Sequence, residues 1–580
     1  MKKSSDPSTE CVIPISYGST EVIETGKWGF QKPQASFMIA PCQEGCPAGN
    51  PIPQFLYSLS QENADEALLA LLRENPFPGV CGRACFHPCE VACNRGQYDE
   101  PVSINSLERY VFDATFEHVP DLRPLPNADP KQVAIVGSGP AGLSCAYFLS
   151  LLGQQVTLFE AKRELGGVLR WGIPEYRLPK SVVRKEIERV LRLGVKAETG
   201  VTVGKNISLQ ELDRYDAIFL SPGAQEHTPL GIEGEDLEQV WRGRDFLERV
   251  TSGERVSLGK EIIVIGGGNT AMDVARSVLR LGARVTIAYR RTRAEMPAMI
   301  DEIREAEEEG ARFEFLVQPV RLSKLRGKRI SVTLQRMRLG DPDSSMRPRP
   351  VPVEGEFLTL NADHLIEAVG EGIDLSWIHH PMMRRGLIDA GPFLSTPADK
   401  IFAGGDAIDQ PRTIVTAIGA GKRAAMAMDL FLRGSPPDEI FSKIHVGQKG
   451  ALSMEAYLSG RKGGDWPEVK EVVHYDKINT LYFERSQRTV MRKLDREQPL
   501  KGFSEVNRGL SPEEAGFSAM RCFSCGTCNY CYNCYFFCPE GIISLDPVSR
   551  TKTVDLEHCK GCGTCAKSCP RYVVEMKEAI

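Results

Sequence analysis

The sequence is poor in the features of exported and membrane-spanning chains. Its first residues are polar and lack the apolar core of a signal peptide. No uninterrupted apolar run approaches the roughly 18 residues needed to cross a bilayer. The formal net charge is −5, so there is no basic excess to attract nucleic acid. We therefore expect a cytoplasmic protein that binds no nucleic acid and reaches a membrane only through a partner.

Cysteine is nearly absent from the middle of the chain and dense near its ends. Of 18 cysteines, only Cys145 lies between positions 94 and 521; seven precede this stretch and ten follow it. Disulfide frameworks belong to small secreted domains, whereas 580 residues suggest three or four globular domains. The two dense groups therefore predict metal sites.

A glycine-rich turn follows the apolar strand that begins at Val133. Glycines at these spacings allow a tight turn, let the backbone approach a pyrophosphate, and open a helix whose N–H groups face phosphate. An acid ends the next strand, where a carboxylate accepts hydrogen bonds from ribose hydroxyls. The alternative is a purely structural turn. The residues predicted to bind a dinucleotide here are Gly137, Gly139, Pro140, Ala141, Gly142 and Glu160.

A second strand–glycine–helix unit begins at Ile262 and ends differently. Aligning the two units by their glycines puts Tyr289 where Glu160 stands, and two arginines follow at once. Guanidinium groups pair with phosphate through charge-assisted hydrogen bonds, whereas an acid would repel a 2′-phosphate. This ending favours NADPH; the alternative is a solvated run of charges. The predicted binding residues are Gly266, Gly268, Asn269, Thr270, Ala271, Arg290 and Arg291.

A third glycine-rich piece runs from Ile401 to Arg423. A strand that delivers Gly-Gly-Asp to the start of a helix can set a carboxylate against the ribityl chain and phosphates of a flavin. Two other strand–glycine passages predict the crossings between two nucleotide domains. The residues predicted from these passages are Gly223, Gly370, Gly405, Asp406, Thr416 and Ala417.

Two longer stretches carry a family resemblance. Residues 166–179 (GGVLRWGIPEYRLP) and 289–298 (YRRTRAEMPA) resemble the β-subunit family of glutamate synthase. That family also includes the N-terminal half of dihydropyrimidine dehydrogenase and the flavin subunits of NADPH–ferredoxin transhydrogenases. The resemblance covers about residues 41–435. It implies that Gly166 and Gly167 contact FAD.

The N-terminal cysteines stand at short, helix-like spacings. Several thiolates in such a setting can hold an iron–sulfur cube, and zinc is the alternative. A flavin without an electron acceptor would be unusual, which favours iron. The candidate ligands are Cys42, Cys46, Cys81, Cys85, Cys89 and Cys93.

The resembling family has two more cysteines before this block, where the present chain has Gln34 and Phe37. By that analogy one cluster remains here, and two clusters is the alternative; Cys42, Cys81 and Cys93 would then either serve a second, incomplete site or simply pack. The family also places a non-cysteine ligand near the position of Glu108. The cluster that remains would be held by Cys46, Cys85, Cys89 and a fourth ligand from another position.

The C-terminal cysteines follow the spacing of two-cluster ferredoxins, in which the fourth cysteine of each run binds the other cluster. Zinc ribbons are the alternative. Cys522 and Cys525 are left over; they either displace two members of the first set or bind something of their own. The first predicted set is Cys528, Cys531, Cys534 and Cys569, and the second is Cys559, Cys562, Cys565 and Cys538.

The expected fold is multidomain α/β with two Rossmann-like dinucleotide-binding domains, a helical iron–sulfur domain and a two-cluster ferredoxin-like α+β domain. The FAD domain is interrupted by the NAD(P)H domain. The expected boundaries are an N-terminal arm at 1–40, the helical domain at 41–125, the FAD domain at 130–235 and 370–435, the NAD(P)H domain at 240–365, a connecting segment at 436–515 and the ferredoxin-like domain at 516–580.

These parts predict an NAD(P)H:acceptor oxidoreductase. NADPH delivers two electrons as hydride, clusters accept one electron each, and FAD converts between them. Hydride transfer itself needs no acid, base or nucleophile, so we expect no catalytic side chain. With about three [4Fe–4S] clusters, the chain would exchange electrons with a partner subunit or ferredoxin in a hetero-oligomeric complex. The alternatives are a flavin-bifurcating transhydrogenase subunit and a non-catalytic electron-wiring scaffold.

Overall fold

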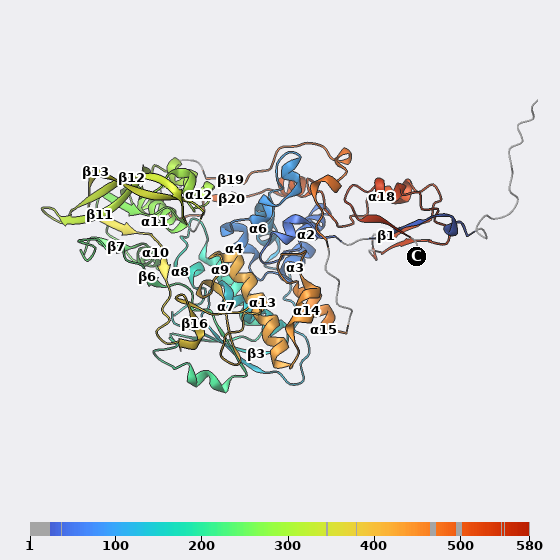
Figure 1. Ribbon diagram of the computed structural model, residues 1–580, viewed down its shortest axis with the longest axis horizontal. Coiled ribbons are helices and arrows are strands. Elements are labelled where there is room, and N and C mark those ends of the chain that lie inside the picture. The colour runs from blue at the N-terminus through green and yellow to red at the C-terminus, as the bar shows by residue number, and fades with distance from the viewer. Residues whose placement is uncertain are drawn as a thin grey trace, which may run out of the picture. The chain divides into compact units, whose positions relative to one another are not determined.

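The computed structural model describes residues 24–35, 38–343, 346–378, 380–463, 471–494, 502–546, 548–549 and 551–578. The chain forms two compact units (Figure 1). The main unit comprises residues 39–472 and 485–522. The terminal unit comprises residues up to 38, 473–484 and 523–580, so it combines both ends of the chain.

The first sheet of the main unit is fully parallel, in the order β18-β5-β2-β3-β4. Its central strands are continuous apolar runs because helices cover both faces of such a sheet. Helix α7 follows β2 and packs along α13, which follows β18 (Figure 1). The elements are β2 Gln132–Val136, α7 Pro140–Leu151, β3 Gln155–Glu160, α8 Val168–Trp171, α9 Lys180–Arg192, β4 Lys196–Thr199, β5 Ala217–Leu220, β18 Ile401–Ala403 and α13 Ile414–Leu432.

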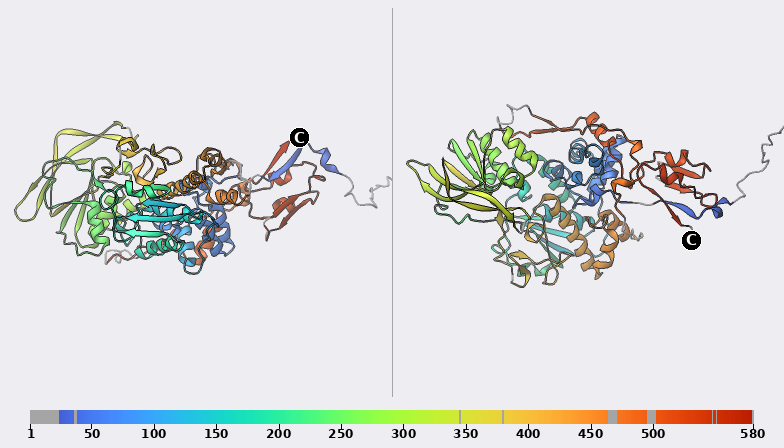
Figure 2. Two further views of the ribbon diagram at one scale, coloured as in Figure 1. Left: turned by 90° about the horizontal axis from the view of Figure 1, so that it is seen from below. Right: turned by 45° about the horizontal axis from the view of Figure 1, so that its top comes forward.

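The second sheet is also parallel, in the order β10-β9-β8-β14-β7. An antiparallel three-stranded sheet is inserted between β10 and β14, and both views of Figure 2 show its long strands. The elements are β7 Val240–Arg242, α10 Gly243–Thr251, β8 Glu261–Ile265, α11 Asn269–Arg280, β9 Arg284–Tyr289, α12 Ile300–Glu308, β10 Arg312–Phe315, β11 Val317–Lys324, β12 Ile330–Pro342, β13 Pro348–Ala362 and β14 His364–Glu367.

Two chain crossings join these sheets. Strand β6 (Glu226–His227) leads out of the first sheet and pairs antiparallel with β15 (Glu371–Gly372), which leads back to it. The second dinucleotide domain is therefore an insertion in the first. The multidomain α/β fold expected from the sequence is confirmed.

Short helices form the N-terminal part of the main unit, and the segment after α13 packs onto them. Helix α16 packs against α2 and α6, and α14 and α15 pack against α13. The stretch expected as a connecting segment is therefore largely part of the main unit. The elements are α1 Pro41–Glu44, α2 Ile52–Ser60, α3 Ala64–Leu72, α4 Pro78–Ala84, α5 Pro88–Val91, α6 Ile104–Thr115, α14 Pro437–Ile444, α15 Met454–Arg461, β19 Arg492–Lys493, β20 Asn507–Gly509 and α16 Pro512–Met520.

The terminal unit contains a strand from the expected N-terminal arm. Strand β1 (Gln31–Ala35) pairs antiparallel with β23 (Val574–Glu578), and Gln34 lies opposite Glu575. The ammonium of Lys32 donates to the carbonyls of Gly26 and Leu556, each at 2.7 Å. An irregular arm was the wrong expectation for this stretch, because its partner strand lies more than 500 residues away. The other elements are α17 Asn533–Phe536, β21 Ile543–Asp546, β22 Thr551–Val554 and α18 Thr564–Lys567.

Candidate functional site: two nucleotide turns and the cysteine groups

The turn after β2 has little room except at one glycine. A Cβ on Gly137, whose φ is +96°, would lie 2.3 Å from the carbonyl oxygen of Ser221, and one on Gly142 would lie 1.9 Å from the oxygen of Gly137. Gly139 has no atom within 4 Å of a Cβ position, and it immediately precedes α7. The turn therefore leaves an open backbone face at a helix N-terminus, which fits a pyrophosphate.

Glu160 is held against this turn. Its buried carboxylate accepts hydrogen bonds from the backbone N–H of Ser138 at 2.9 Å and of Lys162 at 2.8 Å. The backbone N–H of Gly166 donates to the Ser138 carbonyl, and a Cβ on Gly167 would lie 2.9 Å from Cα of Gly139. The acid and the second glycine pair thus close around one loop, in the arrangement expected of an FAD ribose and pyrophosphate site.

The third glycine piece reaches the same edge of the sheet, because β18 is parallel to β5 and β2. A Cβ on Gly421 would lie 2.2 Å from the carbonyl oxygen of Ala141, so α13 and α7 cross in close contact. Thr413 caps α13 by accepting a hydrogen bond from the N–H of Thr416 at 3.1 Å, and Ala417 follows in the first turn.

Asp406 lies just after β18, beside Gly405, whose φ is +69°. Burial raises the pKa of Asp406, and the nearby Arg412 guanidinium opposes that shift. The carboxyl therefore lies at the sheet edge where the flavin was expected, in a segment that contacts α13. Gly223, on the outgoing crossing, has a φ of +74° and open space around its Cβ position.

The turn after β8 repeats this construction. Gly266 has a φ of +143°, and its Cβ would lie 2.2 Å from the carbonyl oxygen of Ala368. Gly268 is open and immediately precedes α11. The side chain of Asn269 accepts from the N–H of Met299 at 2.9 Å, which holds the loop that follows β9 over the start of α11. Ala271 is fully buried and packs the helix onto the sheet.

The two arginines after β9 have different environments. Arg291 is buried, donates to the Pro348 carbonyl at 2.7 Å and pairs with Asp343 at 2.5 Å. Arg290 is exposed. Arg291 is therefore engaged within the protein, because antiparallel strands β12 and β13 bring an acid and a carbonyl to it. Binding of a 2′-phosphate by these arginines stays a prediction, which the exposure of Arg290 favours for that residue.

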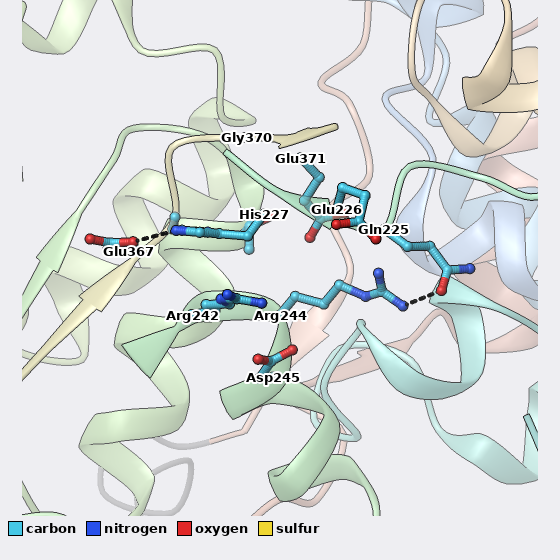
Figure 3. Close-up of a pocket in the computed structure, with 12 residues that line it drawn as sticks. Gln225, Glu226, His227, Arg242, Arg244, Asp245, Glu367, Gly370 and Glu371 are labelled. Atoms are coloured by element: carbon cyan, nitrogen blue, oxygen red, sulfur yellow. Dashed lines mark hydrogen bonds and ion pairs between the residues drawn. The ribbon is translucent and has the colours of Figure 1, made fainter. Parts of the chain in front are cut away.

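A pocket runs from the α11 start to the crossing strands (Figure 3). Thr270 and Gly370, both predicted from the sequence, lie on its wall. Arg244, at the start of α10, reaches across and donates to the side chain of Gln225 at 2.9 Å. Sequence reasoning missed Arg244 and Glu371, although the WRGRD stretch at 241–245 is basic. The pocket therefore places both positively and negatively charged side chains, such as Arg244 and Glu371, beside the second glycine turn.

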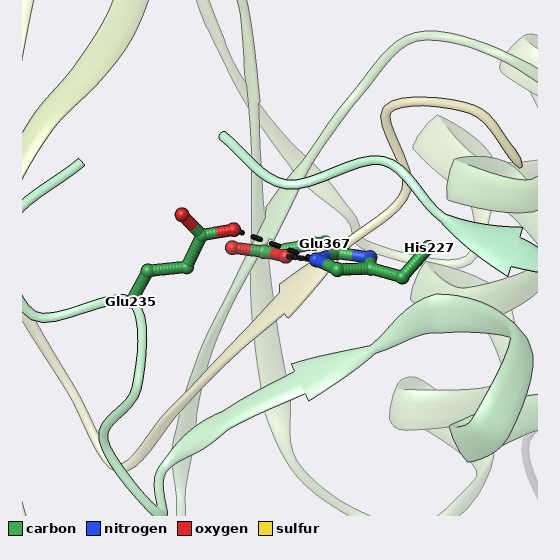
Figure 4. Close-up of side chains that lie close together, drawn as sticks. All are labelled: His227, Glu235 and Glu367. Carbon is green, nitrogen blue, oxygen red and sulfur yellow. Dashed lines mark hydrogen bonds and ion pairs between the residues drawn. The ribbon is translucent and has the colours of Figure 1, made fainter. Parts of the chain in front are cut away.

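Three side chains fix the outgoing crossing (Figure 4). His227 Nε2 lies 3.1 Å from a carboxylate oxygen of Glu367 and 3.4 Å from one of Glu235. Burial and the charge of Glu235 raise the pKa of Glu367 to about 7. Glu235 also accepts from the N–H groups of Leu230 and Gly231, each at 2.7 Å. These three residues form no motif in the sequence, and their contacts position the crossing strand.

The 166–179 motif fastens the two nucleotide domains together. Tyr176 donates to the Asp273 carbonyl at 3.2 Å, and Arg177 forms buried ion pairs with Asp273 at 3.0 Å and with Glu302 at 2.9 Å. Asp273 lies on α11, and Glu302 lies on α12. The motif therefore holds the second domain against the first.

The N-terminal cysteines converge within the short helices. Burial raises the pKa of Cys89, and the neighbouring Cys46, Cys85 and Cys42 add to that shift. Cys85 Sγ accepts from the N–H of His87 at 3.3 Å. Thiols this close, in a buried pocket with N–H donors, fit a cluster that stabilises them as thiolates.

Glu108 lies beside the same group. It accepts from the side chains of Asn50 at 3.0 Å and Asn75 at 3.1 Å, and Asn75 also donates to Cys81 Sγ at 3.5 Å. Burial and the nearby Cys85 thiolate raise the pKa of Glu108. Both Glu108 and Cys81 thus lie near Cys85, and the identity of the fourth ligand stays a prediction. Of the two positions where the family has cysteine, Phe37 lies outside the described residues.

The C-terminal cysteines fall into two spatial groups. Burial and the neighbouring Cys531 and Cys569 raise the pKa of Cys528. Burial and the thiols of Cys528, Cys569 and Cys531 raise the pKa of Cys534. A second pocket is lined by Cys538, Cys559, Cys562 and Cys565. The grouping matches the cross-ligation expected from the spacing, and the ligand roles stay a prediction.

Comparison with known proteins gives three family matches. Pyridine nucleotide-disulphide oxidoreductase matches residues 131–421, dihydropyrimidine dehydrogenase domain II, 4Fe-4S cluster, matches residues 37–119, and the 4Fe-4S binding domain matches residues 552–575. One similar solved structure is that of FprA from Mycobacterium tuberculosis in complex with NADPH. The match covers 53% of this chain and 85% of the FprA chain, with a TM-score of 0.46 and 21% sequence identity. In the described ranges, no helix is both long and apolar enough to span a membrane.

Three curated relatives illustrate the range of similar proteins. NADPH-Fe(3+) oxidoreductase subunit beta of Geobacter sulfurreducens is 36% identical over 84% of this chain and 75% of its own length. The small chain of Escherichia coli glutamate synthase [NADPH] is 35% identical over 66% of this chain and 87% of its own. NADP(+)-dependent formate dehydrogenase subunit beta of Moorella thermoacetica is 40% identical over 68% of this chain, which spans only 60% of that relative.

Proposed function

This chain belongs to the pyridine nucleotide-disulphide oxidoreductase family, and we propose that it is the electron-transfer subunit of an NADPH:acceptor oxidoreductase. The observation that carries the proposal is the pair of open glycine turns in one unit, which end in opposite charges. Glu160 closes the first turn, whereas the exposed Arg290 follows the second. The first suits ribose hydroxyls and the second suits a 2′-phosphate.

The residues around the first sheet would hold FAD. Gly137, Gly139 and Gly142 form the pyrophosphate turn, and Glu160 takes the ribose. The short segment Gly405–Ala407, which contains Asp406, contacts α13. FAD, when bound, takes up a hydride and releases its two electrons singly. The chain supplies positioning for this exchange, because hydride transfer needs no acid or base from the protein.

Thiol–disulfide chemistry is not part of the proposal, although it occurs in the family's name. Such chemistry needs two reactive cysteines beside the flavin. Cys145 is the one cysteine between positions 94 and 521. It is fully buried in α7, and burial raises the pKa of its thiol well above the usual range, so it packs as a small apolar residue.

The electrons would leave through iron–sulfur clusters to another protein. Two of the relatives are named as subunits of larger enzymes, which supports a role in a hetero-oligomeric complex. The terminal unit, with its two cysteine groups, is suited to be the exit to a partner subunit or a ferredoxin. Clusters carry one electron each, so the flavin links the two-electron donor to them.

An anaerobic titration tests the hydride assignment. Purified protein should show a flavin absorbance band near one equivalent of FAD, and stoichiometric NADPH should bleach it. A flavin band that NADPH leaves unchanged in otherwise intact protein would show that the assignment is wrong. Protein without any flavin band after FAD reconstitution would favour the non-catalytic scaffold instead.

A further inference from the structure

Cys42 in α1 and Cys93 just after α5 have no place in the three clusters expected from the sequence. Helices α1 and α5 contact each other. A Cβ on Gly45, one turn after Cys42, would lie 3.0 Å from Cβ of Ala92, the residue before Cys93. The two thiols therefore flank one helix–helix contact.

Cys93 is surrounded by backbone N–H groups. The backbone N–H groups of Val102, Arg95 and Gly96 donate hydrogen bonds to its sulfur. N–H donors of this kind stabilise a thiolate that ligates a cluster. The loop from Arg95 to Val102 is thus the immediate environment of Cys93.

The same loop holds the chain just before Cys522. Arg521 is buried, and its guanidinium donates to Asp99 at 3.1 Å, to the carbonyl of Glu100 at 2.9 Å and to that of Pro101 at 3.3 Å. In return, Arg95 donates to the carbonyl oxygen of Arg521. These reciprocal contacts fix the residue before Cys522 to the loop that surrounds Cys93.

We propose that Cys42, Cys93 and Cys522 ligate one further [4Fe–4S] cluster, distinct from the one beside Cys46, Cys85 and Cys89. Cys522, which the ferredoxin spacing leaves over, thus joins a site that begins near the N-terminus, and all three cysteines lie in the main unit. The chain would carry four clusters.

Iron analysis of single and double variants tests this site. The wild-type protein, reconstituted anaerobically, should hold about 16 irons, four per cluster. Each of C42S, C93S and C522S should lose about four, because each removes a ligand of the same cluster. The double variant C93S/C522S should lose no more than either single variant. The matched control C145S changes a buried thiol outside the cysteine groups and should keep all the iron.

A second double variant makes the result specific. C522S/C528S should lose about eight irons, because Cys528 belongs to a different predicted cluster. About 12 irons in the wild type, an unchanged iron content in C522S, or additive losses in C93S/C522S would each overturn the proposal, as would zinc in place of iron. Flavin content, measured on every variant, reports folding through a site that none of these substitutions touches.

This inference rests on the proposed function only in taking iron–sulfur clusters as the electron carriers. Its readout is metal content, whereas the proposed function is read from flavin bleaching by NADPH. Failure of one test therefore leaves the other unaffected. Low-temperature EPR of the reduced protein gives an independent check, because C522S should remove one cluster signal while C145S removes none.

Discussion

Replacing Arg290 by Ala should raise the KM for NADPH at least tenfold and leave the kinetics with NADH nearly unchanged. Arg290 is the exposed cation after β9. A charge-assisted hydrogen bond contributes about 1.5–3 kcal/mol, and 1.4 kcal/mol corresponds to a factor of ten, so the expected loss is about 10- to 150-fold. NADH has no 2′-phosphate and loses nothing.

Arg291 should behave differently because its guanidinium is already engaged. It donates to Pro348 and pairs with Asp343, whose side chain is 30% exposed. Replacing Arg291 by Ala removes both interactions, which should lower the free energy of unfolding by about 1–3 kcal/mol. The ratio of the KM values for NADPH and NADH should stay close to that of the wild type.

The assay is steady-state reduction of a small dye by each nucleotide, with thermal unfolding measured on the same preparations. Arg293→Ala is the matched control, because its exposed side chain already pairs with Glu307 at 2.6 Å. An equal rise in KM for both nucleotides in Arg290→Ala would refute the reasoning. So would a selective loss of NADPH in Arg291→Ala.

Three further predictions follow from packing. Gly421→Ala should weaken FAD binding and lower the stability of the fold, because its Cβ would lie 2.2 Å from the Ala141 oxygen. Gly516→Ala in α16 meets no atom within 4 Å and should stabilise the protein by about 1 kcal/mol. Thermal unfolding followed by flavin fluorescence compares the two variants, and equal effects would contradict the packing argument. Lys422→Met leaves the buried Glu74 without its cation and should lower the free energy of unfolding, measured with denaturant, by about 3–5 kcal/mol. Adding Glu74→Gln in a double variant should recover part of this loss. A loss below about 1 kcal/mol in Lys422→Met would contradict the prediction. Ending the chain after Cys522 keeps the contact of α16 with α2, so NADPH should still bleach FAD at a near-normal rate. The same truncation should stop electron transfer to a protein acceptor. Reduction of that acceptor at the full rate would mean that electrons leave from the N-terminal clusters instead.

The sequence alone determined the chemistry of the nucleotide and cysteine sites. The first nucleotide turn is encoded by three glycines within six residues, Gly137, Gly139 and Gly142. The two ferredoxin-like runs, which start at Cys528 and Cys559, are encoded by cysteines separated by two or three residues. Such constraints are local, because a turn or a cluster limits the residue types at fixed offsets along the chain. The positions of both glycine turns at strand ends follow for the same reason.

Tertiary structure alone decided which partners the ambiguous residues meet. Arg291 reads like Arg290 in sequence, and only the inserted strands bring Asp343 to it. Strand β1 looks irregular because its hydrogen bonds go to Val574–Glu578. The spacing of the cysteines leaves Cys522 over, and only the contact of Arg521 with Asp99 shows that the chain before it lies on the loop after Cys93. In each case the deciding contact joins residues far apart in the chain, and no local pattern encodes a pairing whose other half lies in a distant segment.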